Sequence, residues 1–377
     1  MSHSTGPGRR LPTSTQSRSK AIVYCEANFG AIDGKTANGL VRRSDRFEIL
    51  SVIDSRLAGL DTGMVLDDEP NGIPIRRDLD DALSNGGADA ELLIVGVAPT
   101  SGLLSRTERG VFLDAMARGL SIVNGLHEFL NDDPEFAAAA VTYGVKILDV
   151  RRPRAKVDLR MFTGDILDVT CPRIAVLGTD GAIGKRTTAT ILTAALNEHG
   201  ISAVLVGTGQ TSLMQGARHG VALDAVPAQF VTGELEGAVV EAFRISRPDV
   251  IVVEGQGALS HPTYLSSTAI LRGSRPQAVI LQHAPARQTI SDFPAFPMPT
   301  PASEIALIET FADTKVIGVT LNHENMTDSE ITAAITTYEF ELGIPVTDAI
   351  ARPTSRLLDM VLAALPELGR DVTAAVV

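Results

Sequence analysis

The sequence predicts an α/β protein with two domains, each built on a mainly parallel sheet with helices on both faces. Apolar runs of strand length alternate with helical patterns along the chain, which is the order that parallel sheets produce. The chain has 377 residues, whereas a single hydrophobic core stops growing at roughly 250–300 residues. Aromatic residues make up only 4% of the sequence, so aliphatic side chains must fill the cores, as in buried parallel sheets.

The first domain is expected to span residues 20–150. Residues 1–19 before it are rich in Ser, Thr, Arg, Pro and Gly and contain no acidic residue, which is typical of a disordered tail. Apolar runs predict the strands of this domain, and apolar residues at helical spacing predict the helices between them. The expected strands are 21–25, 47–53, 92–97, 121–123 and 145–148, and the expected helices are 35–43, 106–119 and 134–140.

A linker is expected over residues 151–172, because a basic run around Pro153 interrupts the alternation. A solvated segment is favoured there over a patch that binds phosphate. The second domain, 173–377, restarts the alternation, and its residues 293–301 contain four prolines that favour an irregular loop. The expected strands are 173–177, 203–206, 250–253, 278–281 and 316–320, and the expected helices are 184–198, 234–245, 303–311 and 328–342.

Composition argues against several classes of protein. The net charge is −12, which disfavours a protein that binds nucleic acid. No apolar run approaches the ~20 residues that a membrane-spanning helix needs. Cys25 and Cys171 are the only cysteines, too few for a disulfide framework or a zinc site, so a cytoplasmic location is expected.

The strongest motif is a glycine-rich turn between an apolar strand and a helix, at residues 178–188. Backbone N–H groups of such a turn, with the helix N-terminus, form a cradle for phosphate. Lys185 is expected to reach the terminal phosphates, and the Thr187 hydroxyl to ligate Mg²⁺ if metal is used. The spacing departs from the common P-loop, because five residues separate Gly178 from Gly184 and Arg186 follows the lysine. The predicted cofactor-binding residues of this loop are Gly178, Thr179, Asp180, Gly181, Gly184, Lys185, Arg186, Thr187 and Thr188.

Polar turns also follow three other strands of the second domain, and carboxyl ends of parallel strands meet at one edge of a sheet. Glu254 ends a strand and is expected to be a functional carboxylate, with a helix-capping acid as the alternative. His261 is expected to act as a base or to donate to a substrate, or else to be structural. Asn322 is expected to contact the base of the cofactor. The predicted substrate-binding residues at these turns are Gly207, Thr208, Gly209, Gln210, Thr211 and Gln256.

The first domain carries weaker signals. Lys35 and Arg42 offer positive charge for a carboxylate ligand, although a solvated helix face would have the same residues. The turn after the first expected strand lacks the G-x-G-x-x-G pattern, so little favours a nicotinamide site there.

Several of these motifs resemble known families. Residues 178–185, Gly-Thr-Asp-Gly-Ala-Ile-Gly-Lys, and residues 254–257, Glu-Gly-Gln-Gly, resemble the loop and the acidic turn of dethiobiotin synthetase. The closer resemblance is to the family of D-glutamate N-acetyltransferase, and it covers roughly residues 20–365. The segments that carry it are 35–42, 125–130, 149–151, 207–211 and 254–257, followed by His261-Pro262.

This resemblance implies a Rossmann-like first domain, a P-loop second domain and transfer of an acetyl group from acetyl-CoA to a small amino acid, D-glutamate or a similar D-amino acid. The loop would hold the phosphates of coenzyme A, and Glu254 or His261 would deprotonate the amine. The N–H groups of residues 207–211 would lie near the oxyanion, and Lys35 and Arg42 would bind the substrate carboxylate. Members of the family commonly have Cys in place of Gly181, so a mechanism that needs a thiol there does not apply. A homo-oligomer is also expected.

Two alternatives remain from the sequence. The first is a ligase or kinase that activates a carboxylate with ATP and Mg²⁺, in which Lys185 and Thr187 hold the nucleotide and Glu254 holds the metal. The second is a nucleotide-binding regulatory protein without an enzymatic activity. A requirement for Mg²⁺ would separate the first alternative from the acetyltransferase.

Overall fold

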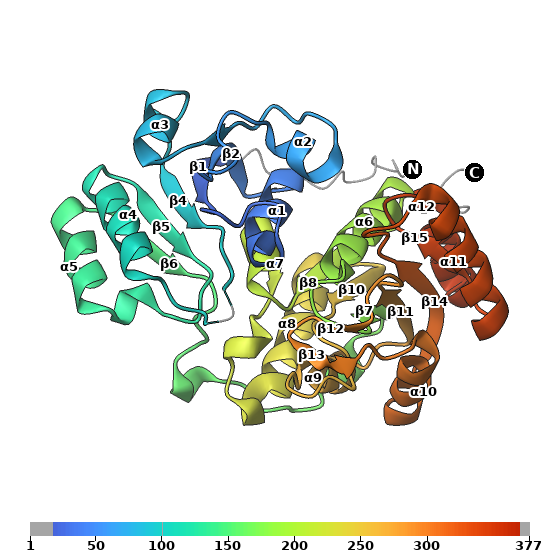
Figure 1. Cartoon of the computed structure of the whole chain (residues 1–377). Helices are drawn as coiled ribbons and strands as arrows, with labels where there is room; N and C mark the ends of the chain where they lie inside the picture. Colours follow the sequence, from blue (N-terminus) through green and yellow to red (C-terminus); the bar gives the residue numbers. More distant parts are fainter. Residues whose placement is uncertain (1–17, 100, 370–377) are drawn as a thin grey trace, which may run out of the picture.

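Two α/β sheets with their helices lie side by side in the structure, a computed structural model that describes residues 18–99 and 101–369. Figure 1 shows the first sheet in blue to teal and the second in green to red, with α1 (Lys35–Arg42) and α7 (Gln210–Gln215) at the boundary between them. The tail expected over residues 1–19 lies outside the described residues up to residue 17, and Ser19 already begins the first strand.

The first sheet has six parallel strands in the order β3-β2-β1-β4-β5-β6. This is the strand order of the Rossmann fold, so the expected α/β class is confirmed for the first half. Its strands are β1 (Ser19–Tyr24), β2 (Phe47–Ile53), β3 (Ile75–Arg76), β4 (Leu92–Val95), β5 (Ser121–Asn124) and β6 (Ile147–Asp149). Its helices, besides α1, are α2 (Thr62–Asp67), α3 (Leu79–Ser84), α4 (Arg106–Ala117) and α5 (Pro134–Tyr143).

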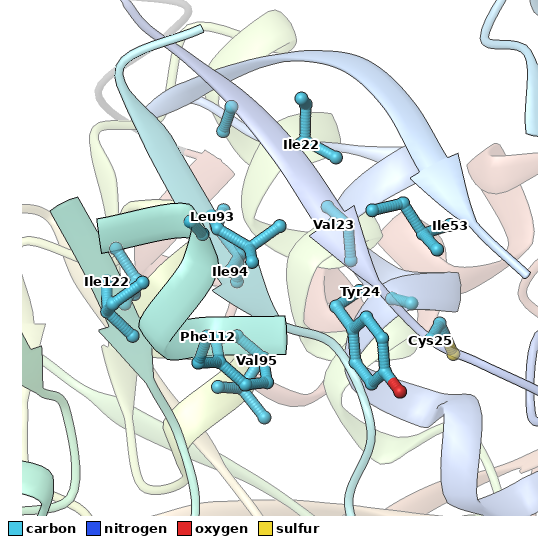
Figure 2. Close-up of a cluster of buried hydrophobic side chains, with 14 of the residues drawn as sticks. Ile22, Val23, Tyr24, Cys25, Ile53, Leu93, Ile94, Val95, Phe112 and Ile122 are labelled. Carbon is cyan, nitrogen blue, oxygen red and sulfur yellow. The ribbon is translucent and has the colours of Figure 1, made fainter. Parts of the chain in front are cut away.

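Strand β1 lies inside this sheet, and its residues from Ala21 onward are buried. A central parallel strand is covered by helices on both faces, which is why a continuous apolar run forms it. The ring of Tyr24 packs edge-on against Phe112 of α4, with ring centres 5.3 Å apart. Figure 2 shows this cluster, in which side chains of β4 lie beside those of β1.

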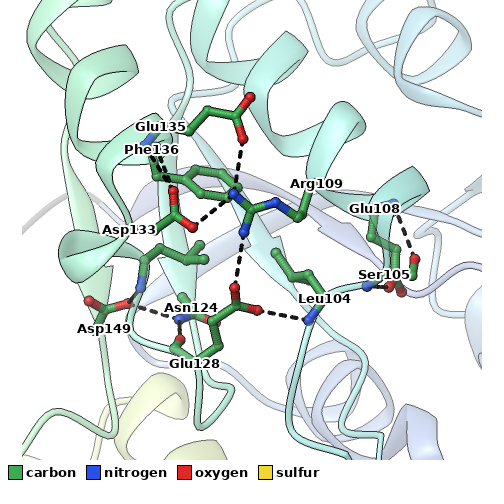
Figure 3. Close-up of polar contacts among 11 residues, drawn as sticks. Leu104, Ser105, Glu108, Arg109, Asn124, Glu128, Asp133, Glu135, Phe136 and Asp149 are labelled. Carbon is green, nitrogen blue, oxygen red and sulfur yellow. Dashed lines mark hydrogen bonds and ion pairs between the residues drawn. The ribbon is translucent and has the colours of Figure 1, made fainter.

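The turn after β5 is held in place by Arg109 of α4. The guanidinium forms ion pairs with Glu128 (3.0 Å), Asp133 (2.8 Å) and Glu135 (2.9 Å) and lies 4.9 Å from the ring centre of Phe136. Figure 3 shows this network. Glu128 belongs to the 125–130 segment, so at least this residue of the segment has a structural role.

The second sheet has seven parallel strands in the order β15-β14-β11-β7-β10-β8-β9. Its strands are β7 (Arg173–Gly178), β8 (Ala203–Gly207), β9 (His219–Gly220), β10 (Val250–Glu254), β11 (Ala278–His283), β14 (Lys315–Leu321) and β15 (Val346–Asp348). Its helices, besides α7, are α6 (Lys185–Glu198), α8 (Val231–Ser246), α9 (Ser266–Ser274), α10 (Pro301–Phe311), α11 (Asp328–Leu342) and α12 (Thr354–Ala364).

Strand β7 is the central strand of this sheet, and its residues alternate between two cores. Ile174 and Val176 lie in a cluster with residues of α6 and α12. Ala175 and Leu177 lie in a cluster with residues of α8 to α11. Because α6 packs on the strand that precedes it, the turn between them is fixed at the carboxyl edge of the sheet.

Residues 289–297 form a two-stranded antiparallel hairpin, which corrects the irregular loop expected over residues 293–301. Strand β12 (Thr289–Ile290) pairs with β13 (Phe293–Pro297), with one irregularity in the register. Prolines fit here because each strand of a two-stranded sheet has one edge whose N–H groups need no partner. Pro301 then occupies the first turn of α10, where its missing N–H is not needed.

The segment expected as a linker, 151–172, is partly folded against the second sheet. Glu236 of α8 accepts three backbone N–H groups from residues 163–166 at 2.7–3.2 Å, and Ile166 is fully buried. Arg151 is also buried, with Nε donating to the Gly125 carbonyl oxygen at 2.6 Å. The prediction of a solvated segment is therefore wrong for Arg151, whereas the side chains of Arg152, Arg154 and Lys156 are exposed.

Across residues 18–99 and 101–369, every helix is too short or too polar to cross a bilayer.

Candidate functional site

The glycine-rich turn lies where the sequence places it, between β7 and the N-terminus of α6. Ala182 and Gly184 have φ angles of 48° and 100°, so the turn passes through the left-handed region twice. A Cβ atom on Gly178 would lie 2.8 Å from the Gln282 carbonyl oxygen, which requires glycine at that position. Successive backbone N–H groups of such a turn are arranged to bind an anion.

Lys185 is the first residue of α6, and its side chain is only 5% exposed. Its ammonium group donates a hydrogen bond to the backbone carbonyl oxygen of Asp180, inside the loop. Burial lowers the pKa of Lys185 to about 7, although the carboxylates of Asp180 and Glu254 oppose the shift. A bound phosphate would favour the charged form of this lysine.

The hydroxyl groups of the loop have different partners. Thr188 donates to Gln282 Oε1 at 2.6 Å, and Thr179 is hydrogen-bonded to Nδ1 of His283 at 2.9 Å. Thr187 makes no side-chain hydrogen bond within the part of the chain that the structure describes. Of the paired threonines, Thr187 is therefore the one whose hydroxyl is available to a ligand.

Arg186 leaves the loop and lies against helix α1 of the first domain. A Cβ atom on Gly39 would lie 2.5 Å from Arg186 Nη2. Burial lowers the pKa of Arg186, whereas the nearby Glu254 carboxylate raises it. A common P-loop has Ser or Thr directly after the lysine as the ligand of Mg²⁺. In this chain a guanidinium group comes from that position and lies within electrostatic range of Glu254.

Glu254 ends β10 and is 6% exposed. Its Oε2 accepts the backbone N–H groups of Thr208 at 2.8 Å and Gly209 at 3.2 Å. Burial raises the pKa of Glu254, while Arg186 and these two N–H groups lower it. The N–H groups of Thr208 and Gly209 are thus already bonded to Glu254 in this structure, whereas the resemblance implied that N–H groups of residues 207–211 would bind an oxyanion. Gln256 donates to the Thr208 hydroxyl at 2.9 Å and completes this contact.

The rest of the 207–211 turn connects the two domains. Gly207 ends β8, and Gln210 begins α7, which packs against α1. The hydroxyl groups of Thr211 and Thr36 are 3.1 Å apart, and Met214 of α7 is buried in the core of the first domain. The Thr211 hydroxyl is therefore bonded across the domain boundary.

His261 is 6% exposed and has one nitrogen with a partner and one without. Its Nδ1 accepts the backbone N–H groups of Thr263 and Tyr264, each at 3.2 Å. The ring stacks on Tyr264 at 4.3 Å between centres. Its Nε2 is buried and has no hydrogen-bond partner among the described residues. Burial lowers the pKa of His261, while Asp180 and Asp292 raise it.

Asp180 and Arg287 form a contact that the sequence analysis did not predict. Asp180 is fully buried, and its Oδ2 accepts Arg287 Nη1 at 3.2 Å and the Ser291 N–H at 3.0 Å. Arg287 also donates to the carbonyl oxygens of Gly181 and Ala182, both at 3.1 Å, so it fixes the shape of the loop. Its place beyond the end of β11 is the only signal of this role in the sequence.

The predicted cations of the first domain have different positions. Lys35 begins α1, and its side chain is exposed. Desolvation of its ammonium group by the surrounding protein and the positive charge of Arg151 lower its pKa. Arg151 is buried, which lowers its pKa to about 10. Arg42 instead pairs with Asp67 of α2 at 2.6 Å, so its charge is already engaged outside the loop.

Asn322 lies past the end of β14, where its side chain bonds within its own turn. Its Oδ1 accepts the Glu324 N–H at 3.1 Å, and its Nδ2 donates to the Glu324 carboxylate at 3.3 Å. Contact with the base of a cofactor stays a prediction. Among residues 18–99 and 101–369, no three His, Cys, Asp or Glu side chains group as ligands of a metal ion would.

Two cavities lie away from the phosphate loop. One, of about 210 Å³, is lined by residues of the 151–160 segment and α8. The other, of about 310 Å³, lies in the first domain and includes Asn28, Asp33 and Glu108. Residues of the phosphate loop line neither of these cavities.

Known proteins match this chain over most of its length. The Rossmann-like domain of unknown function DUF1611 matches residues 55–153, and the P-loop domain of the same name matches residues 160–358. A protein of Tritonibacter scottomollicae named D-glutamate N-acetyltransferase is 30% identical over 282 residues, 73% of this chain and 82% of the relative. A protein of the same name from Pseudoalteromonas sp is 27% identical over 267 residues, 69% of this chain and 78% of the relative.

A solved structure also matches both halves. The crystal structure of a DUF1611 family protein from Anabaena variabilis superposes with a TM-score of 0.84 at 30% sequence identity. The match covers 92% of this chain and 100% of that one. The arrangement of the two sheets is therefore shared with a protein whose structure is known from experiment.

Proposed function

This chain belongs to the DUF1611 family and is similar to two proteins named D-glutamate N-acetyltransferase, and we propose that it is an N-acetyltransferase. In the proposed reaction, the acetyl group of acetyl-CoA moves to the amine of a small amino acid, D-glutamate or a similar D-amino acid. The P-loop binds the phosphates of coenzyme A as anions, and no phosphoryl group is transferred.

The observation that carries the proposal is the position of Arg186. Phosphoryl transfer from ATP relies on a metal ion that bridges the phosphates, held by the hydroxyl after the P-loop lysine. Here Arg186 follows Lys185, and its guanidinium lies in range of Glu254. A loop with Lys185 and with arginine in place of the metal-binding hydroxyl suits binding of phosphates that stay intact, because a lysine binds phosphate without metal.

The acceptor is proposed to bind between the phosphate loop and the first domain. Lys35 and Arg151 bring positive charge to the same region. Arg151 lowers the pKa of Lys35, and both cations lower the pKa of His127. Arg151 is paired with Asp224, whereas Lys35 forms no ion pair among the described residues. A carboxylate of the acceptor would supply the missing negative charge at Lys35.

A ligase or kinase that uses ATP and Mg²⁺ remains the second candidate, and the Thr187 hydroxyl favours it. That hydroxyl has no partner among the described side chains, and a hydroxyl in the first turn of α6 is a suitable Mg²⁺ ligand. In this candidate Glu254 would approach the metal.

Release of free thiol from acetyl-CoA tests the proposal. The purified protein is mixed with acetyl-CoA and D-glutamate in the presence of EDTA, and thiol is followed with a chromogenic disulfide. We expect thiol release that requires the acceptor. Parallel reactions contain L-glutamate, no acceptor, or ATP with Mg²⁺. Product formation that requires ATP and yields ADP or AMP would establish the second candidate instead.

A further inference from the structure

Two buried polar atoms near the phosphate loop have no partner among the described residues. They are Nε2 of His261 and Oδ1 of Asp180. Buried polar atoms in folded proteins are nearly always hydrogen-bonded, so each such exception calls for an explanation. Both residues are more than nine-tenths buried, at 6% and 0% exposure.

The bonds of His261 decide which of its nitrogens carries the proton. Nδ1 accepts hydrogen bonds from two backbone N–H groups, those of Thr263 and Tyr264, so its lone pair is the acceptor and it carries no hydrogen. The neutral ring must then carry its hydrogen on Nε2. Burial lowers the pKa of the ring, which favours this neutral form at pH 7. The unpartnered Nε2 is therefore a donor, and it cannot accept a proton as a base would.

The bonds of Asp180 leave one oxygen for a ligand. Oδ2 accepts from Arg287 and from the Ser291 N–H, which holds the carboxylate in one orientation. Oδ1 has no such partner and is an acceptor. Asp180 thus presents a fixed and unpaired acceptor from within the phosphate loop itself.

The donor and the acceptor belong to one site. His261 stacks on Tyr264, whose hydroxyl donates to Asp292 Oδ2 at 2.6 Å. The N–H group of Ser291, the residue before Asp292, donates to Asp180 Oδ2 at 3.0 Å, and the Asp180 carboxylate raises the pKa of His261. A ligand that satisfies both atoms must accept one hydrogen bond and donate another. An amine next to the carbonyl group of a thioester meets both requirements.

We propose that Asp180 and His261 are the catalytic pair of the acyl transfer, with Asp180 Oδ1 as the base for the acceptor amine and His261 Nε2–H as the donor to the thioester carbonyl oxygen. The inference rests on the proposed function and names residues for it. It also gives the base role to Asp180 in place of Glu254, whose Oε2 is bonded to two backbone N–H groups.

In this reaction, Asp180 carries the proton from the amine to the leaving thiolate. The neutral amine attacks the carbonyl carbon, the C–N bond forms, and the carbonyl oxygen becomes an oxyanion that accepts from His261 Nε2–H. The nitrogen loses a proton to Asp180 Oδ1. The C–S bond breaks, and Asp180 returns the proton to the departing thiolate, which leaves as coenzyme A. No oxidant, metal or substrate beyond acetyl-CoA and the acceptor amine is needed.

Asp180→Asn tests the base, because it removes the charge at nearly constant shape. We expect turnover to fall by about 10²–10⁴-fold, the usual contribution of a general base. Affinity for coenzyme A, measured by calorimetry, should be unchanged or higher, since a negative charge beside the phosphates is lost. Turnover within fivefold of the wild type would overturn the assignment. So would a drop in coenzyme A affinity and melting temperature that accounts for the whole loss.

His261→Phe tests the donor, and His219→Phe is its matched control. His219 is also 6% exposed with an unpartnered buried Nδ1, but it lies on β9 and bonds Ser246 of α8. We expect His261→Phe to lose about 10²–10³-fold in turnover, as loss of an oxyanion donor does, and His219→Phe to keep wild-type turnover. Equal losses in both would overturn the donor role.

The wild-type assay distinguishes a failure of the proposed function from a failure of the Asp180–His261 pair. A wild-type protein that releases no thiol from acetyl-CoA with any small amino acid contradicts the proposed function and this pair together. A wild-type protein that is active while Asp180→Asn and His261→Phe are active too contradicts the pair alone.

Discussion

Arg186 on the phosphate-loop helix lies against Gly39 on helix α1 of the other domain. Only glycine leaves room for the guanidinium, since a Cβ atom at residue 39 would be 2.5 Å from Nη2. The cofactor loop of the second domain is thereby in direct contact with the first domain. A change on α1 should reach the phosphate site through this contact.

Gly39→Ala should weaken binding of coenzyme A by about tenfold, because the new methyl group pushes Arg186 away from its position. Unfolding free energy should change by less than about 1 kcal/mol, since a flexible side chain can move and alanine favours the helix. Gly110→Ala is the matched control, as Gly110 is also helical and has no atom within 4 Å of its Cβ position. Equal affinities of both variants in calorimetry would contradict the coupling.

Arg186→Thr restores the Gly-Lys-Thr order of a common P-loop. We expect wild-type affinity for coenzyme A to be the same with EDTA or Mg²⁺. The variant should bind coenzyme A about tenfold more weakly with EDTA, and Mg²⁺ should improve its affinity for ATP. A wild-type protein whose affinity for coenzyme A depends on Mg²⁺ would show that Arg186 does not replace the metal.

Lys185→Ala should weaken binding of coenzyme A by about 2–4 kcal/mol, as loss of a charged contact from a desolvated site does. The melting temperature should fall little, because within the part of the chain that the structure describes the ammonium has a single hydrogen bond, to the Asp180 carbonyl oxygen. The exposed Lys146→Ala serves as the control for loss of a positive charge. Unchanged affinity in Lys185→Ala would mean that phosphate binds elsewhere.

Glu254→Gln should reduce turnover by less than about tenfold. The Gln carbonyl oxygen can still accept the N–H groups of Thr208 and Gly209, and the proton acceptor is Asp180 in this account. Steady-state rates of this variant beside Asp180→Asn compare the two carboxylates directly. A loss of 10²-fold or more in Glu254→Gln, with wild-type rates in Asp180→Asn, would return the base role to Glu254.

His283 should make the protein less stable in acid. Burial lowers its pKa from 6.5 to about 4, while the unfolded chain keeps the ordinary value. The unfolded state therefore binds the proton first, so the contribution of His283 is complete above pH 6.5 and is lost as pH falls toward 4. Between pH 7 and 4.5, urea unfolding should show a loss about 2–3 kcal/mol larger in the wild type than in His283→Gln. The exposed His199→Gln should behave as the wild type, and parallel curves for all three proteins would contradict the argument.

The sequence was sufficient for the two sheets because their central strands are continuous apolar runs. It did not indicate the helices α9 and α12, nor the short elements α2, α3, α7, β3, β9 and β15. Such short elements are specified by the contacts that they make. Met214 of α7, for example, is buried in the core of the other domain.

The position of the candidate site in the fold could be predicted from the sequence, but the hydrogen bonds of its polar atoms could not. The order of residues placed Lys185 and Glu254 at one edge of the sheet, but it could not show which polar atoms are already bonded. The N–H group of Thr208 is bonded to Glu254, and Arg42 is paired with Asp67. Arg287 comes from a loop with no motif, and only the folded chain brings it to Asp180.

The most direct test of the central claim is the product of the reaction itself. Wild-type protein, acetyl-CoA and D-glutamate are incubated with EDTA, and both products are measured by mass spectrometry. The account predicts N-acetyl-D-glutamate and free coenzyme A in equal amounts, without ATP or metal. No acetylated amino acid from any small D- or L-amino acid, or acetylation only when ATP and Mg²⁺ are added, would contradict it.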